Sequence, residues 1–174
     1  EAMTILDGLG LTSIPPEGEA LRAQVRAFLQ DAVKDIPAHI RAKSWSGYDP
    51  AFSRKLGAQG WLGMTFPKAY GGHEQGAFAR YVVVEELLNF GAPVGSHWIA
   101  ERQSGPLLLK YGTDEQKERW LKPLLDQEMF SAYSMTEPHA GADPTMFTTS
   151  AVRDGDDWVI NGWKFFSSNA ATAS

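Results

Sequence analysis

Cysteine is absent from the 174 residues of the chain. Its absence excludes disulfide bonds, thiolate zinc sites and cysteine nucleophiles. A chain without cysteine is compatible with a reducing compartment. We therefore expect a cytoplasmic location, or the mitochondrial matrix if the source is eukaryotic.

Basic residues are outnumbered, because 16 lysines and arginines stand against 21 acidic residues and give a net charge of -5. No basic stripe is interleaved with aromatic residues, which argues against a nucleic-acid partner. The longest apolar run, residues 81–84, is far too short for membrane insertion. Residues 1–20 lack the basic and apolar segments of a signal peptide, so none is predicted.

Several kinds of catalytic site lack their sequence signatures. No glycine-rich run matches a dinucleotide-binding or phosphate-binding loop, and no Gly-x-Ser-x-Gly nucleophile elbow is present. The four histidines show no metal-ligand spacing. We therefore expect no metal site, and a structural or surface role for each histidine.

Helical periodicity dominates the first two thirds of the chain. Residues 1–16 predict an irregular lead-in, and residues 17–128 predict an N-terminal helical domain. The first helix is expected to follow Gly18 and to end at Pro37. A second helix is expected from the cap at Asp49 to Gly60, followed by a loop with buried aromatics.

Further helices are predicted before residue 128. Residues 74–90 favour a largely buried helix, since apolar residues cover most of its circumference: Phe78, Tyr81, Val82, Val84, Leu87 and Leu88. Residues 95–111 predict a helix that bends at Gly105 and Pro106. Thr113 and Gln116 form a capping box for the next helix. For Glu85, Glu86 and Glu101 we expect solvent or salt-bridge roles.

The period changes near residue 128. Residues 129–136, 148–153 and 158–168 predict strands, with a hairpin turn at residues 154–156. Three strands leave sheet edges unpaired. We therefore interpret residues 129–174 as the truncated first part of a β domain that needs further sequence or a partner chain.

Two segments of this β region carry the chemistry. Residues 133–143 run from a strand into a Glu-Pro turn and a loop of small residues, which lets a ligand approach the backbone. In an extended strand, Phe166 and Ser168 share one face, which suits a flat, polar ring system. Trp163 and Phe165 are then expected to point into the core. Taken alone, the first segment has the alternative of an ordinary strand–loop connection, and the second has the alternative that Phe166 is an ordinary core aromatic.

Taken together, these segments resemble the acyl-CoA dehydrogenase family. The matching segments are Met135-Thr136-Glu137-Pro138, Gly141-Ala142-Asp143, Asp154-Gly155, Asn161-Gly162-Trp163-Lys164 and Phe166-Ser167-Ser168-Asn169. Upstream, Pro67 with residues 70–72, and residues 111–117, also look like family segments. Ordered segments at suitable spacing are much more specific than any one of them.

The resemblance implies a fold and a cofactor. Family members have an N-terminal helical domain, a middle β domain and a C-terminal helical bundle. The chain is thus expected to be α+β, with an all-α domain followed by the beginning of an antiparallel β-barrel-like domain, and without the bundle. Family members bind FAD between the β domain and the bundle. The residues implied at the cofactor are Tyr133, Met135, Thr136, Gly141, Ala142, Phe166 and Ser168.

The resemblance also implies individual roles. Thr136 hydrogen-bonds the pyrimidine end of the isoalloxazine, Phe166 lies against the flavin, and Ser168 donates towards N5. Ala142 also approaches the CoA part of the substrate. Two positions depart from the family pattern. Ala142 stands where many members have Ser and loses a hydroxyl contact, and Phe166 stands where several have Trp and offers less stacking area.

The activity implied by the resemblance is the α,β-dehydrogenation of an acyl-CoA thioester in fatty acid and lipid metabolism, with hydride transfer to flavin N5. An electron-transferring flavoprotein is the implied acceptor, and a homodimer or homotetramer the implied assembly. The family's catalytic base lies in the bundle, so no catalytic residue is nominated here, and Glu137 is assigned to the turn motif. Two alternative functions stay open: a flavin-dependent oxidase or monooxygenase on the same fold, and a non-catalytic subunit.

Overall fold

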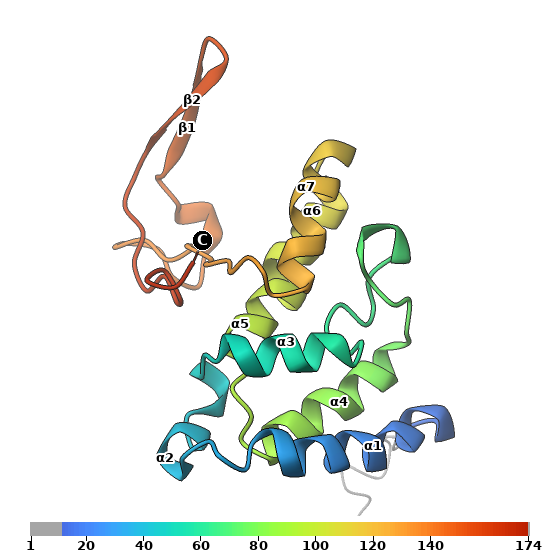
Figure 1. The fold of residues 1–174 in the computed structure, drawn as a ribbon. Helices are drawn as coiled ribbons and strands as arrows, with labels where there is room; N and C mark the ends of the chain where they lie inside the picture. Colours follow the sequence, from blue (N-terminus) through green and yellow to red (C-terminus); the bar gives the residue numbers. More distant parts are fainter. Residues whose placement is uncertain (1–11, 174) are drawn as a thin grey trace, which may run out of the picture.

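The chain folds into a body of helices from which a β-hairpin projects (Figure 1). The computed structural model describes residues 12–173, so residues 1–11 of the expected lead-in lie outside the described residues. Helices occupy the chain up to residue 125, and the hairpin follows it. This order confirms the predicted α+β class with an all-α N-terminal part.

The first helix, α1 (Pro16–Ala32), begins with proline at its first turn and carries acidic residues there, as suits a helix N-terminus. It ends at Ala32, earlier than predicted. Pro37 instead precedes the short helix α2 (Ala38–Arg41) as its N-cap residue. Proline fits there because its missing N–H and fixed φ cost nothing at a helix start.

The second predicted helix is confirmed as α3 (Pro50–Ala58). The Asp49 carboxylate accepts hydrogen bonds from the backbone N–H groups of Ala51 and Phe52, which caps the first turn. A short 3₁₀ turn, η2 (Ser44–Ser46), precedes it, and another, η3 (Lys68–Tyr70), lies in the following loop. Trp61 and Phe66 are buried in that loop, as expected.

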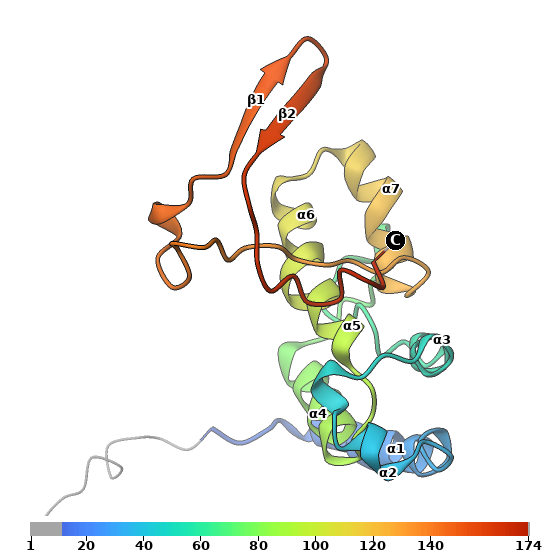
Figure 2. The same ribbon diagram turned by 90° about the vertical axis from the view of Figure 1, so that its left-hand side faces the viewer.

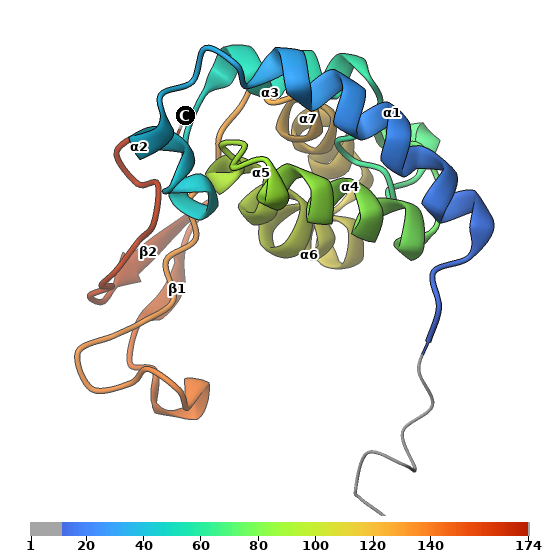
Figure 3. The same ribbon diagram turned by 90° about the horizontal axis from the view of Figure 1, so that it is seen from below.

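Helix α4 (Ala77–Asn89) packs alongside α1, as Figure 3 shows from below. The prediction that most of its circumference is buried is wrong, because Phe78, Tyr81 and Leu88 are exposed. Only the stripe that faces α1 and α3 is buried, with Val82, Val83, Glu86 and Leu87. The reason is that few elements cover the outer face of α4 within the described residues.

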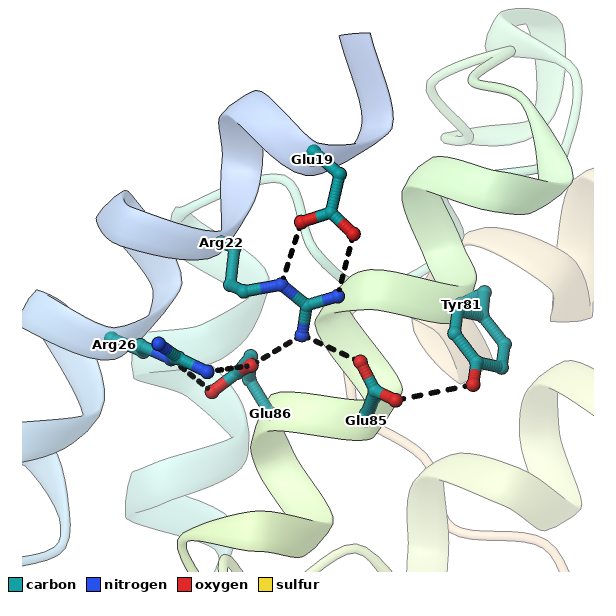
Figure 4. Close-up of polar contacts among 6 residues, drawn as sticks. All are labelled: Glu19, Arg22, Arg26, Tyr81, Glu85 and Glu86. Atoms are coloured by element: carbon teal, nitrogen blue, oxygen red, sulfur yellow. Dashed lines mark hydrogen bonds and ion pairs between the residues drawn. The ribbon is translucent and has the colours of Figure 1, made fainter. Parts of the chain in front are cut away.

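A network of charges joins α1 to α4 (Figure 4). The buried Glu86 carboxylate accepts hydrogen bonds from Arg22 at 2.5 Å and from Arg26 at 2.8 and 3.0 Å. Arg22 also contacts Glu19 and Glu85. Charge-assisted hydrogen bonds of this kind are stronger than neutral ones, so the network fixes how the two helices lie against each other.

Residues 95–111 form a continuous helical run, as predicted, composed of α5 (Gly95–Ile99), the π-helical turn η4 (Ala100–Ser104) and α6 (Gly105–Tyr111). The wide turn ends where Pro106 removes a backbone donor. Gly105 is required there, since an added Cβ would meet the Ala100 carbonyl oxygen at 2.5 Å and the Phe66 ring at 2.8 Å. Helix α7 (Asp114–Leu125) begins with the predicted Thr113–Gln116 capping box.

Two apolar clusters hold the helices together. The larger cluster joins α1, α3, α4 and the loop after α3, with Leu29, Leu56, Met64 and Val83 among its fully buried members. The smaller cluster packs Phe66 against α7. Removing this much apolar surface from water is the main source of stability for the helical part.

The predicted hairpin is confirmed. Strands β1 (Ser150–Asp154) and β2 (Asp157–Asn161) pair antiparallel, and Gly155 adopts the left-handed conformation that the turn requires. Residues 144–146 form a 3₁₀ turn, η5 (Pro144–Met146), before it. Both strands are exposed along their whole length, and the hairpin stands clear of the helices (Figure 2).

Two strand predictions are wrong in extent. Residues 129–136 contribute only an isolated bridge, and β2 ends at Asn161 rather than continuing to residue 168. Trp163 and Phe165 are exposed rather than in the core. A strand needs neighbouring backbone with which to form hydrogen bonds. Within the described residues, few such partners lie beside these segments.

Candidate functional site

Two segments of the β region, residues 131–136 and 162–169, lie side by side (Figure 2). Tyr133 and Ser168 form an antiparallel bridge, and the Phe165 N–H donates to the Thr136 carbonyl at 2.8 Å. The Ser134 and Ser167 hydroxyls are 2.6 Å apart. The structure thus brings together two regions that the sequence separates by about thirty residues, including the predicted cofactor residues Tyr133, Thr136 and Ser168.

The Glu137 carboxylate fastens these segments to the start of the hairpin. It accepts hydrogen bonds from the Thr148 N–H at 2.7 Å, the Thr148 hydroxyl at 2.9 Å and the Thr149 N–H at 3.0 Å. Lys164 donates to Oε1 at 2.8 Å, the same oxygen that accepts from the Thr149 N–H. The Lys164 ammonium, with these hydrogen bonds, holds the pKa of Glu137 well below its usual range. The carboxylate is therefore committed to structure, in agreement with its assignment to the turn motif.

Lys164 has more than one partner. Besides Glu137, its Nζ donates to the Met135 carbonyl at 2.8 Å and lies 4.1 Å from the centre of the Phe147 ring. One cation therefore links the segment before the loop, the segment after the hairpin and the approach to β1. This arrangement fixes the backbone on which the predicted cofactor residues stand.

Among residues 12–173, Phe166 is the most exposed large hydrophobic residue, at 88%. Its backbone has a φ of 55°. The alternation that placed Phe166 and Ser168 on one face assumed an extended strand, and this premise is wrong, because a left-handed residue breaks the alternation. A bulky residue in this conformation is strained. Phe166 thus presents an uncovered ring from a strained backbone position.

The loop after the Glu-Pro turn is open. The Glu-Pro turn itself is closed by reciprocal backbone hydrogen bonds between Glu137 and Ala140, of 2.9 and 3.1 Å. Gly141 and Ala142 are exposed, and a Cβ added at Gly141 would meet nothing within 4 Å. Asp143 accepts from the backbone and hydroxyl of Thr145. The loop can therefore receive a ligand against its backbone without displacing a side chain.

One of the contacts between the β segments and the helical body lies at α5. The Asn169 amide donates to the Gly95 carbonyl at 3.1 Å. Gly95 begins the helical run through η4, and beside that run lies a pocket of about 290 Å³. Its apolar wall contains Trp45, Trp61, Leu62, Val84, Leu87, Leu88, Val94 and Trp98. Arg80, His97, Glu101 and Arg102 give it polar groups.

Two of these polar groups are buried. The Glu101 carboxylate accepts from the Gly63 N–H at 2.7 Å and lies 3.6 Å from Arg80. Burial raises the pKa of Glu101, and Arg80 opposes the shift. His97 lies 2.7 Å from the Ser53 hydroxyl, and burial lowers the pKa of His97 to about 4. The imidazole is therefore neutral at physiological pH.

Comparison with known proteins follows the two parts of the fold. Residues 15–128 match the acyl-CoA dehydrogenase N-terminal domain, and residues 132–174 match the acyl-CoA dehydrogenase middle domain. The chain belongs to the acyl-CoA dehydrogenase family. The predicted resemblance is thereby confirmed.

Known acyl-CoA dehydrogenases are similar over most of the chain. A short-chain-specific acyl-CoA dehydrogenase of Clostridium acetobutylicum is 36% identical over 158 residues, which are 90% of this chain and 41% of that protein. Among solved structures, the Tcur3481-Tcur3483 steroid ACAD has a TM-score of 0.78 at 37% identity, covering 95% of this chain and 43% of its own.

A third relative carries a reduced flavin. The glutaryl-CoA dehydrogenase of Mycobacterium smegmatis in complex with FADH2 has a TM-score of 0.76 at 25% identity, covering 91% of this chain and 41% of its own. The chain thus spans about two fifths of the length of the acyl-CoA dehydrogenases that it matches. In residues 12–173, no helix is both long and apolar enough to cross a membrane.

Sequence reasoning missed the polar groups of the pocket as a set. Ser53 and His97 are separated by 44 positions, and Gly63 and Glu101 by 38. No periodicity connects residues on different helices at such separations. The only local signal was an ionisable side chain in an otherwise apolar stretch, and such a residue usually lies at the surface. The expected salt-bridge roles of Glu86 and Glu101 are nevertheless found, in buried positions.

Proposed function

We propose that this chain supplies the helical domain, residues 17–128, and the FAD-facing first part of the β domain, residues 129–174, of an FAD-dependent acyl-CoA dehydrogenase. The enzyme would remove hydrogen from the α and β carbons of an acyl-CoA thioester. The observation that carries the proposal is the junction of the two β segments, where Glu137 and Lys164 hold a strained, open Phe166 beside an open loop of small residues.

The residues at this junction fit FAD. Phe166 offers an uncovered aromatic ring for a flat isoalloxazine, and Ser168 and Thr136 offer hydroxyls on the adjoining segments. Within the described residues, the backbone N–H groups of Gly141 and Ala142 donate to no acceptor, which leaves them for a pyrophosphate. The Glu137 charge is compensated by Lys164 and does not repel such an anion.

We assign FAD contacts to seven residues of this chain: Tyr133, Met135, Thr136, Gly141, Ala142, Phe166 and Ser168. Bound FAD would supply the hydride acceptor at N5. Thr136 and Ser168 would orient the ring, Phe166 would exclude water from one side of it, and Ala142 would also meet the CoA part of the substrate. No residue of this chain is proposed as the catalytic base.

The remaining features of the proposal follow the family. We propose an acyl-CoA as substrate, an electron-transferring flavoprotein as acceptor, a homodimer or homotetramer as assembly, and a cytoplasmic location. The steroid ACAD among the similar structures and the bound FADH2 in another support the substrate and cofactor classes.

The visible spectrum of the full-length protein tests the proposal. Flavin absorbance should appear on adding FAD and should bleach when acyl-CoA is added without oxygen. Phe166→Ala should weaken FAD binding about tenfold through lost ring contact, while Phe78→Ala on α4 should not change it. Absence of flavin absorbance would leave a non-catalytic subunit, and bleaching only by an added reductase would indicate a monooxygenase.

A further inference from the structure

The two β segments of the proposed FAD site are attached to the helical body at neighbouring points. The Asn169 side-chain amide donates to the Gly95 carbonyl at 3.1 Å. The Phe130 ring, just before the other segment, packs edge-on against Tyr48 with ring centres 4.9 Å apart. Tyr48 follows Gly47, whose carbonyl accepts from the Gly95 N–H at 2.8 Å. This part of the helical body therefore holds both segments.

The backbone that accepts from Asn169 is closely packed. A Cβ added at Gly95 would meet the Gly47 carbonyl oxygen at 2.8 Å, and one added at Gly47 would meet Pro93 at 2.9 Å. Close-packed backbone of this kind has little room to move. The Gly95 carbonyl therefore presents a fixed acceptor to the Asn169 amide.

Ser168 lies between two residues with left-handed backbone. Phe166 has a φ of 55° and Asn169 a φ of 65°. The alternation of side chains along an extended strand therefore does not set the direction of the Ser168 side chain, which is exposed. That direction depends instead on the contacts that hold this backbone, namely the bridge from Ser168 to Tyr133 and the hydrogen bond from Asn169 to Gly95.

Asn169 combines two properties that suit this place. Asparagine tolerates left-handed backbone better than most residues, and its side-chain amide donates hydrogen bonds. The Asn169 carbonyl accepts from the N–H groups of Thr172 and Ala173 at 2.9 and 3.0 Å, and from the Thr172 hydroxyl at 3.1 Å. The turn after Asn169 thus has hydrogen bonds of its own, and the amide makes the connection to Gly95.

We propose that Asn169 is a positioning residue, which orients the Ser168 hydroxyl towards the flavin by hydrogen-bonding the adjoining backbone to Gly95. The amide acts through Ser168 and does not itself contact the cofactor. This inference rests on the proposed function, since Ser168 is one of the proposed FAD contacts. It adds that the helical body sets the direction of a contact made by the β domain.

Substitutions at Asn169 in the full-length protein test the inference, with the Kd for FAD measured by flavin fluorescence. Asn169→Gly removes the amide and accepts a φ of 65° without strain. Asn169→Asp keeps the shape of the side chain, but its ionised carboxylate cannot donate to the Gly95 carbonyl. Each change should raise Kd about three- to tenfold, the value of one hydrogen bond.

Thr172→Ala is the matched control for these changes. It removes a side-chain hydrogen bond from the same turn without touching the connection to Gly95. The Kd for FAD should therefore change by less than about twofold, because one exposed hydrogen bond contributes little when backbone hydrogen bonds close the same turn.

A double variant separates positioning from general support of the fold. If Asn169 acts through Ser168, Asn169→Gly should change Kd by less than about twofold in a protein that already contains Ser168→Ala. A residue that only supports the fold would weaken FAD binding by the same factor in both backgrounds. Asn169→Gly and Ser168→Ala should also shift the visible flavin bands in the same direction, because both weaken the same hydrogen bond to the ring.

The outcomes separate this inference from the function on which it rests. Absence of FAD binding by the unaltered protein would overturn the proposed function together with the inference. Unchanged FAD affinity in both Asn169 variants would overturn the inference alone. Equal weakening by Thr172→Ala, or equal factors with and without Ser168→Ala, would do the same, and would show that Asn169 stabilises its turn rather than orienting Ser168.

Discussion

Lys164 and Glu137 form a 2.8 Å ion pair that joins two segments of the proposed FAD site across 27 positions of sequence. Lys164→Met removes the cation and also the hydrogen bond to the Met135 carbonyl. The segments that contain Thr136 and Phe166 should then separate. We expect the Kd for FAD, measured by flavin fluorescence, to rise about tenfold or more, equivalent to one lost charged hydrogen bond.

Lys122→Met is the matched control for this change. Lys122 also has a carboxylate partner, Asp126, but the pair lies one turn apart on the exposed face of α7. Exposed pairs contribute little, so FAD affinity should stay within a factor of two. Equal FAD affinity in the two variants would contradict the role given to Lys164.

Phe166→Gly should separate stability from cofactor binding. Glycine accepts a φ of 55° without strain, and the ring it removes is 88% exposed and contributes little to packing. The free energy of unfolding of the protein without FAD should therefore stay within about 1 kcal/mol of the original or rise. FAD affinity should fall, since the ring is the proposed stacking surface. A variant that loses stability and retains FAD affinity would show that Phe166 is a structural residue.

Sequence patterns predicted those parts of the molecule that depend on local interactions. The Asp49 cap, the Thr113–Gln116 capping box and the turn at Gly155 are each set by residues within four positions of one another. The site segments were found because family motifs mark them. Their conformation was not predicted, because the pairing of Tyr133 with Ser168 and the left-handed backbone of Phe166 depend on contacts between distant residues.

The close approach of Gly105 to the π-helical turn can be tested by comparing an alanine at Gly105 with an alanine at Gly57 in α3. Gly105→Ala places a Cβ 2.5 Å from the Ala100 carbonyl oxygen, so the backbone or Phe66 must move, and the free energy of unfolding should fall by about 1–3 kcal/mol. Gly57→Ala, inside α3, places a Cβ that meets only Leu62 at 3.7 Å. This change should raise the free energy of unfolding by about 0.5–1 kcal/mol. Urea denaturation measures both. Equal effects would mean that the close approach at Gly105 is not required.

The charge network between α1 and α4 should be strongest at its buried carboxylate (Figure 4). Glu86→Gln should cost on the order of 2 kcal/mol of unfolding free energy, the value of charge-assisted hydrogen bonds, while Glu85→Gln, at a partly exposed carboxylate, should cost less than about 1 kcal/mol. Arg26 and Arg22 lower the pKa of Glu86 from 4.5. Its stabilisation is therefore complete above pH 4.5 and is lost as pH falls through the lower folded pKa, so Glu86→Gln should be less acid-sensitive in that range.

His97 should give the protein a second, separate dependence on pH. Burial lowers its pKa from 6.5 to about 4 in the folded state, so the unfolded chain binds a proton between these values while the folded chain does not. Stability contributed by the neutral imidazole is complete above pH 6.5 and declines as pH falls towards 4, by on the order of 3 kcal/mol. His97→Gln cannot titrate, and its unfolding free energy, measured by urea denaturation at several pH values, should lose this slope while keeping the decline below pH 4.5 that Glu86 causes. An unchanged slope between pH 6.5 and 4 would show that His97 is not buried as a neutral base.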